Sequence, residues 1–165
     1  MIEVTLETIQ VSLVSSHRIV VLKEIASDRY LPIWIGPCEA EAISVGVKGV
    51  QMLRPLTHDL IVSVIDALDA ELQYVFVNEL VDNNFRARLV LAAPDGERSV
   101  DARPSDAVAT AVRLGTPIFV DEAVMEQASV SPEPDVLDEA TLDAKDLGVF
   151  RDFLSSLDVG DPKDN

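Results

Sequence analysis

The amino-acid sequence predicts an α+β fold, a single domain in which helices pack on a mixed β-sheet. Apolar and polar residues alternate in several short runs, which is typical of half-buried strands. Two stretches of helical periodicity begin directly at a proline, Pro37 and Pro104, which is favourable at the first helical position. A length of 165 residues suits one domain with a substantial core.

The first half of the chain predicts three strands. Residues 3–14 alternate and are expected to pair with a strand starting at Ile19, with His17 in the turn as a solvated residue. Tyr30–Ile35 is a nearly continuous apolar run, which predicts a central strand. A helix over residues 37–48 is expected to follow it.

A second helix is expected over residues 57–69, with Thr57 as its N-cap. Residues 72–81 and 85–92 then predict another hairpin, and a further strand ends at Ala102. A helix over 104–114, a short strand at 118–120 and a helix capped by Asp121 complete the domain, with six or seven strands in its sheet.

The corner between the strand ending at Ala102 and the next helix concentrates polar residues. Asp101, Arg103, Ser105 and Asp106 are expected at one sheet edge, beside a helix N-terminus that favours anions. A purely structural reading is equally open: Asp106 is then a helix-start residue, and Arg103 pairs with one of the two aspartates.

The same corner occurs earlier in the chain. Pro37 aligns with Pro104 and Glu39 with Asp106, each after a strand and before an alanine-containing helix. We interpret this as an internal βββα pseudo-repeat.

The last residues differ in composition from the rest. Residues 1–128 are expected to form the domain, and residues 129–165 an acidic linker, a short amphipathic helix over 142–157 and a disordered tail. The formal net charge of the whole chain is −16, so it should repel polyanions unless donors or cations gather locally.

Composition also restricts the class of protein. Cys38 is the single cysteine, which excludes an internal disulfide and a multi-cysteine metal site. No apolar run reaches the roughly 18 residues of a membrane helix, and no signal peptide pattern is present. We expect no membrane association and a cytoplasmic location.

Two further motifs are candidates for binding. His58 begins a helix beside Asp59 and near Arg54, where it is either functional or a capping or surface residue. Arg86 and Arg88 lie two apart in a strand and so face the same way. They form either a phosphate-binding ridge or a solvated outer face.

Five motifs in order resemble the bifunctional nuclease family, over roughly residues 2–128. They are Leu31–Gly36, Glu39-Ala40, Arg54–Leu60, Phe85-x-Ala87-x-Leu89 and Asp101–Ala107, with residues 150–154 similar to the family's tail. The resemblance implies DNase and RNase activity on nucleic acid, and a wedge-shaped homodimer with a large groove as active site.

For a nuclease, the sequence offers residues in each role. His58, Asp59, Asp101 and Asp106 are the predicted catalytic residues, with His58 as general acid or base. The predicted metal ligands for Mg²⁺ or Mn²⁺ are Glu39, Asp59 and Asp106, since these ions prefer carboxylates. The predicted substrate-binding residues are Arg54, Arg103, Ser105, Arg86 and Arg88.

We expect these residues, in particular His58, Asp59, Arg103 and Asp106, to converge on one groove. Alternatively, the protein is a non-catalytic, dimeric regulatory module that binds a ligand or a protein. In that case the carboxylates are helix caps and the arginines form structural salt bridges.

Overall fold

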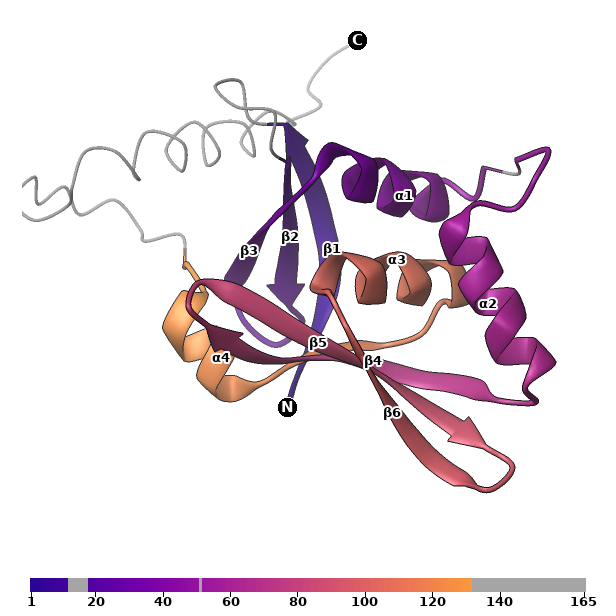
Figure 1. Ribbon diagram of the computed structural model, residues 1–165. Helices are drawn as coiled ribbons and strands as arrows, with labels where there is room; N and C mark the ends of the chain where they lie inside the picture. The colour runs from indigo at the N-terminus through magenta and orange to yellow at the C-terminus, as the bar shows by residue number, and fades with distance from the viewer. Residues whose placement is uncertain (12–17, 51, 132–165) are drawn as a thin grey trace, which may run out of the picture. The chain divides into compact units, whose positions relative to one another are not determined.

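The computed structural model describes residues 1–11, 18–50 and 52–131, all within one compact unit, Met1–Ser131. Groups of strands and of helices follow one another along it, as Figure 1 shows. The strands are β1 Ile2–Val11, β2 Arg18–Glu24, β3 Tyr30–Ile35, β4 Glu71–Val81, β5 Asn84–Ala93, β6 Gly96–Ala102 and β7 Ile118–Val120. The helices are α1 Pro37–Val47, α2 Thr57–Ala67, α3 Pro104–Leu114 and α4 Glu122–Ala128.

The strands form one seven-stranded mixed sheet in the order β3-β2-β1-β7-β4-β5-β6. Neighbours are antiparallel except β7 and β4, which are parallel. The predicted α+β class, the two hairpins and the three helix positions are therefore confirmed. Three strands followed by a proline-started helix occur twice, as β1–β3 with α1 and as β4–β6 with α3. An internal duplication stays a prediction.

The prediction that Tyr30–Ile35 is a central strand was wrong. β3 lies at one edge of the sheet and pairs only with β2 along its length. Leu31, Ile33 and Ile35 are buried, whereas Trp34 is exposed, so the strand is buried on one face. Its Pro32 suits an edge, because proline cannot donate a ladder hydrogen bond.

The core lies between the sheet and the helices. In Figure 1, α3 lies between the β1–β3 and β4–β6 parts of the sheet, and it contacts α1, α2, β4 and β5. Ala107, Ala109 and Ala111 are completely buried in it. Helix α1 approaches α3 closely at Gly46, where a Cβ atom would lie 2.8 Å from Val112 Cγ2.

The helix starts follow the sequence signals except at one point. Pro104 occupies the first position of α3 after Arg103, and Gly115 ends the helix with φ 66°. Asp121 caps α4 by accepting a hydrogen bond from the Ala123 amide at 3.0 Å. The prediction of Thr57 as an N-cap was wrong, because Leu56 has that position and its amide donates to Asp59 Oδ2 at 2.8 Å.

Some predictions fall outside the described residues, namely the turn at 15–17 and the helix over 142–157. The domain boundary at residue 128 stays a prediction. None of the described helices is long and apolar enough to cross a membrane.

Candidate functional site

A cavity of about 420 Å³ lies between the starts of α1, α2 and α3. Its polar wall brings together Glu39 from α1, His58 from α2, and Arg103 and Asp106 from the β6–α3 corner. Cys38, Met52 and Thr57 are among the other residues that line the cavity. The predicted convergence of His58, Arg103 and Asp106 on one groove is therefore present in the structure.

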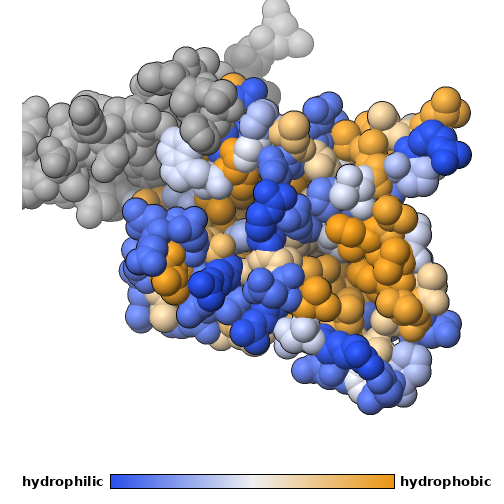
Figure 2. Space-filling view, in the orientation of Figure 1, coloured by the Kyte–Doolittle hydropathy of each residue, from blue (hydrophilic) through white to orange (hydrophobic). Residues whose placement is uncertain are grey.

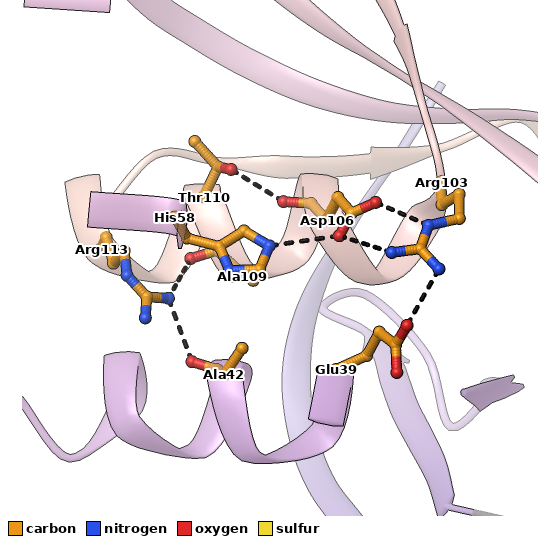
Figure 3. Close-up of polar contacts among 8 residues, drawn as sticks. All are labelled: Glu39, Ala42, His58, Arg103, Asp106, Ala109, Thr110 and Arg113. Carbon is orange, nitrogen blue, oxygen red and sulfur yellow. Dashed lines mark hydrogen bonds and ion pairs between the residues drawn. The ribbon is translucent and has the colours of Figure 1, made fainter. Parts of the chain in front are cut away.

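Arg103 links the two proline-started corners. Its Nε and Nη2 donate to Asp106 at 2.7 and 3.1 Å, and its Nη1 donates to Glu39 Oε1 at 2.9 Å. Figure 3 shows these contacts as one row of side chains from Glu39 through Arg103 and Asp106 to His58. The guanidinium thus lies between two carboxylates while 65% of the side chain is exposed.

Gly36 makes room for this arrangement. A Cβ atom at that position would overlap the Glu39 carboxylate, so any other residue there would move Glu39 away from its present place.

Asp106 is ionised in this environment. Burial by itself raises the pKa of the carboxyl, but hydrogen bonds and charge from Arg103 and His58 outweigh it, and the pKa lies below its ordinary value. Thr110 holds the backbone at this point by donating to the Asp106 carbonyl at 2.8 Å.

The ionised Asp106 determines which ring nitrogen of His58 carries a hydrogen. His58 Nε2 lies 3.2 Å from Asp106 Oδ1, and a carboxylate only accepts, so Nε2 carries a hydrogen. Nδ1 of the neutral ring then has a free lone pair. No residue in the described part of the chain makes a hydrogen bond to Nδ1. The His58 side chain is buried, which restricts its rotation.

Asp59 does not face this cavity, although it is adjacent to His58. Its two oxygens accept from the Leu56 amide at 2.8 Å and from Arg113 Nε at 2.7 Å. Hydrogen bonds from Arg113 and then Leu56 lower the pKa of Asp59 below its ordinary value. Asp59 is therefore a structural ligand of Arg113.

Arg113 is the residue that sequence reasoning missed. Its side chain is 8% exposed, and besides Asp59 its Nη1 donates to the carbonyls of Ala42 at 3.0 Å and Ala109 at 2.7 Å. One guanidinium thereby joins α1, α2 and α3 behind the cavity. The available signal was a single arginine between the apolar residues Val112 and Leu114, near the end of the helix.

The remaining predicted residues lie apart from this cluster. Arg54 is exposed before α2, and Asp101 is exposed on β6 opposite Arg88. Arg86 and Arg88 are both exposed on β5, on the same face of the strand, and Arg86 pairs with Glu79 at 3.3 Å. None of these four lines the cavity. Ser105 is buried and lines a smaller, adjoining cavity.

The predicted metal ligands do not fit a metal as they are arranged. Asp59 is bound to Arg113, and Arg103 lies between Glu39 and Asp106. Within residues 1–11, 18–50 and 52–131, no group of three or more His, Cys, Asp and Glu side chains is placed to hold an ion. A requirement for Mg²⁺ or Mn²⁺ stays a prediction.

Comparison with known proteins identifies the fold's relatives. The family model of the bifunctional nuclease domain matches residues 20–133. An "Uncharacterized protein" of Mycobacterium tuberculosis is 42% identical over 163 residues, 98% of each chain.

Two plant proteins are more distant. "Bifunctional nuclease 1" of Arabidopsis thaliana is 25% identical, covering 86% of this chain and 51% of that protein. "Bifunctional nuclease 1" of Oryza sativa subsp. japonica is 27% identical, covering 66% and 34%. This chain thus spans about a third to a half of these plant relatives. The family match covers most of the described domain, and the chain belongs to the bifunctional nuclease domain family.

Proposed function

We propose that this protein hydrolyses phosphodiester bonds of DNA and RNA in the cavity between α1, α2 and α3. The observation that carries the proposal is the His58–Asp106–Arg103 cluster on the cavity wall. It combines an imidazole oriented by an ionised carboxylate with a guanidinium, which binds phosphate oxygens in a bidentate manner. The names of the plant relatives support a nucleic-acid substrate.

In the proposed reaction, a water oxygen attacks phosphorus and the bond from phosphorus to one sugar oxygen breaks. His58 Nδ1 takes the proton from the water, while Asp106 keeps Nε2 protonated and stabilises the imidazolium that forms. Arg103 stabilises the charge on the non-bridging oxygens. The departing sugar oxygen is protonated by the imidazolium or by solvent.

Glu39 must leave Arg103 for a phosphate to bind. Two like charges about 4 Å apart repel by roughly 4 kcal/mol near a protein surface, so phosphate and Glu39 cannot share the guanidinium at low cost. Because Glu39 contacts only Nη1, displacing it keeps both bonds from Arg103 to Asp106. Glu39 therefore occupies the place of a phosphate in the free protein.

The test is hydrolysis of single-stranded DNA, duplex DNA and RNA by purified protein, with Mg²⁺, with Mn²⁺ and with a chelator. Asp106→Asn removes the charge that orients His58 and should lower turnover by about 10²-fold or more. Asp66→Asn, which changes an exposed carboxylate on α2, is the matched control. Equal activity of the two variants would contradict the proposed site, and wild-type activity unaffected by chelator would contradict the predicted requirement for Mg²⁺ or Mn²⁺.

A homodimer is also proposed. Leu60, Val64 and Leu68 recur every four residues along α2 and its end, and they are 58%, 49% and 67% exposed. Figure 2 shows hydrophobic side chains gathered over this helix. An exposed apolar stripe of this kind is typical of a protein interface.

Sedimentation velocity should give about twice the 17.9 kDa chain mass, and Val64→Lys should give the monomer. A wild-type mass near 17.9 kDa at all concentrations would refute the dimer. We also propose a cytoplasmic location, which is suggested by the composition of the chain.

A further inference from the structure

A second cavity, of about 260 Å³, adjoins the proposed active site. Glu39 and Arg103 line both cavities, so a ligand held by Arg103 can extend from one into the other. The rest of the wall of the smaller cavity comes from the β3–α1 corner, the β4–β5 turn and the start of α3.

One part of this wall is aromatic. Phe85 lines the cavity at the start of β5, half-buried and packed against the core, so its position is held by its neighbours. Trp34 also lines the cavity and is 54% exposed. Aromatic side chains of this kind are the surfaces on which unpaired bases stack in proteins that bind single strands.

Another part of the wall carries neutral donors and acceptors. Asn83 has φ 60° in the turn, and within the described residues its side-chain amide has no hydrogen-bond partner. Asn84 Nδ2 donates to the Asp82 carbonyl at 2.9 Å, so its Oδ1 remains available as an acceptor. The Ser105 hydroxyl is a third neutral group. Amides offer both donors and acceptors, as base edges require.

The charge and the volume of the smaller cavity restrict the kind of ligand that it can bind. Among the residues that line the cavity, only Glu39 and Arg103 are charged, and they are paired with each other. A second phosphate would have no cation of its own there. The volume is below the roughly 300–1,000 Å³ of pockets for drug-sized ligands, which suits a single ring system.

We propose that the smaller cavity is a nucleobase subsite, which takes one unpaired base beside the phosphate held by Arg103. The inference rests on the proposed function for the identity of that phosphate. A base cannot stack on Phe85 and meet the Asn83 and Asn84 amides while it remains paired in a duplex. The site therefore favours single-stranded nucleic acid.

The experiment compares adenosine 5′-monophosphate with ribose 5-phosphate, which lacks the base. Binding is measured by calorimetry and by the fluorescence of Trp34, the single tryptophan of the chain. The nucleotide should bind about tenfold more tightly, since stacking on one aromatic residue has roughly that effect. It should also change the Trp34 emission in a saturable way.

Two variants test the assigned wall. Asn83→Gly removes the amide and suits the positive φ at that position, and Phe85→Leu removes the ring while keeping an apolar side chain. Each should reduce the preference for the nucleotide to about twofold. Phe76→Leu is the matched control, because Phe76 is half-buried in the same hairpin and does not line the cavity.

Equal binding of the two ligands by the wild type would overturn the subsite, and so would an unchanged preference in both wall variants. These results do not depend on turnover. Base-selective binding by a protein that hydrolyses no nucleic acid would refute the proposed function and support the subsite. Hydrolysis without base-selective binding would support the proposed function and refute the subsite.

Discussion

Replacing Arg113 with methionine is expected to lower the free energy of unfolding by about 3 kcal/mol, or roughly 10 °C in Tm. The buried guanidinium donates to Asp59 and to the carbonyls of Ala42 and Ala109. Methionine fills similar space but removes all three of these hydrogen bonds, and it leaves the Asp59 carboxylate without its cation. Urea unfolding followed by circular dichroism measures the change.

Arg98→Met is the control for this prediction. Arg98 also pairs with an aspartate, Asp95, but the two side chains are 61% and 63% exposed. Exposed pairs contribute little, so its effect should be below about 1 kcal/mol. Equal losses in the two variants would contradict the assigned role of Arg113.

The pH dependence of unfolding provides a second test of the role of Arg113. The pKa of Asp59 is lowered in the folded protein by Arg113, so this pair stabilises the fold fully above the unfolded value, about 3.8. The contribution is lost as the pH falls through the lower, folded pKa. The difference between wild type and Arg113→Met should therefore be constant from pH 7 to about 5 and shrink below about pH 4.

Arg103→Ala is expected to lower the rate of phosphodiester hydrolysis by about 10²- to 10³-fold, because it removes the donors aimed at the developing charge. Stability should change by less than about 1 kcal/mol, since the Arg103 side chain is 65% exposed in its ion pairs. Single-turnover hydrolysis and urea unfolding of the same preparation give the two numbers.

Arg103→Lys separates charge from geometry. Lysine keeps the positive charge but cannot bind Asp106 through two nitrogens, so its activity should lie between alanine and wild type. Arg98→Ala, which changes an exposed arginine outside the cavity, is the control. A large loss of stability with unchanged hydrolysis would instead favour the non-catalytic, scaffolding alternative.

Local signals were sufficient to predict most of the fold. Proline at the first helical position, glycine after Leu114 and alternating apolar residues each depend on a few neighbours in the chain. The place of β3 in the sheet could not be predicted in this way, because apolar content reports burial and not the order of strands. Pro32 was the one local sign that β3 is an edge strand.

The candidate site was also predictable only where its contacts are local in sequence. Asp106 and Arg103 are three residues apart, and their contact follows from the helix start. Their contacts with His58 and Glu39 cross 48 and 64 positions and depend on how α1, α2 and α3 pack. The sequence predicts Asp59 in the same groove, but its side chain lies outside it, because it is held by Arg113.

The position of β7 has a consequence for how the protein is made. This strand is the last of the described sheet in chain order, yet it lies in the middle and alone joins β1 to β4. While the chain is being synthesised, β1–β3 and β4–β6 can form only two separate sheets, each with an open edge that invites wrong pairing. Residues 118–120 must emerge from the ribosome before the two parts join into one sheet. Glu39 follows the first part, in α1, and Arg103 follows the second part, before α3.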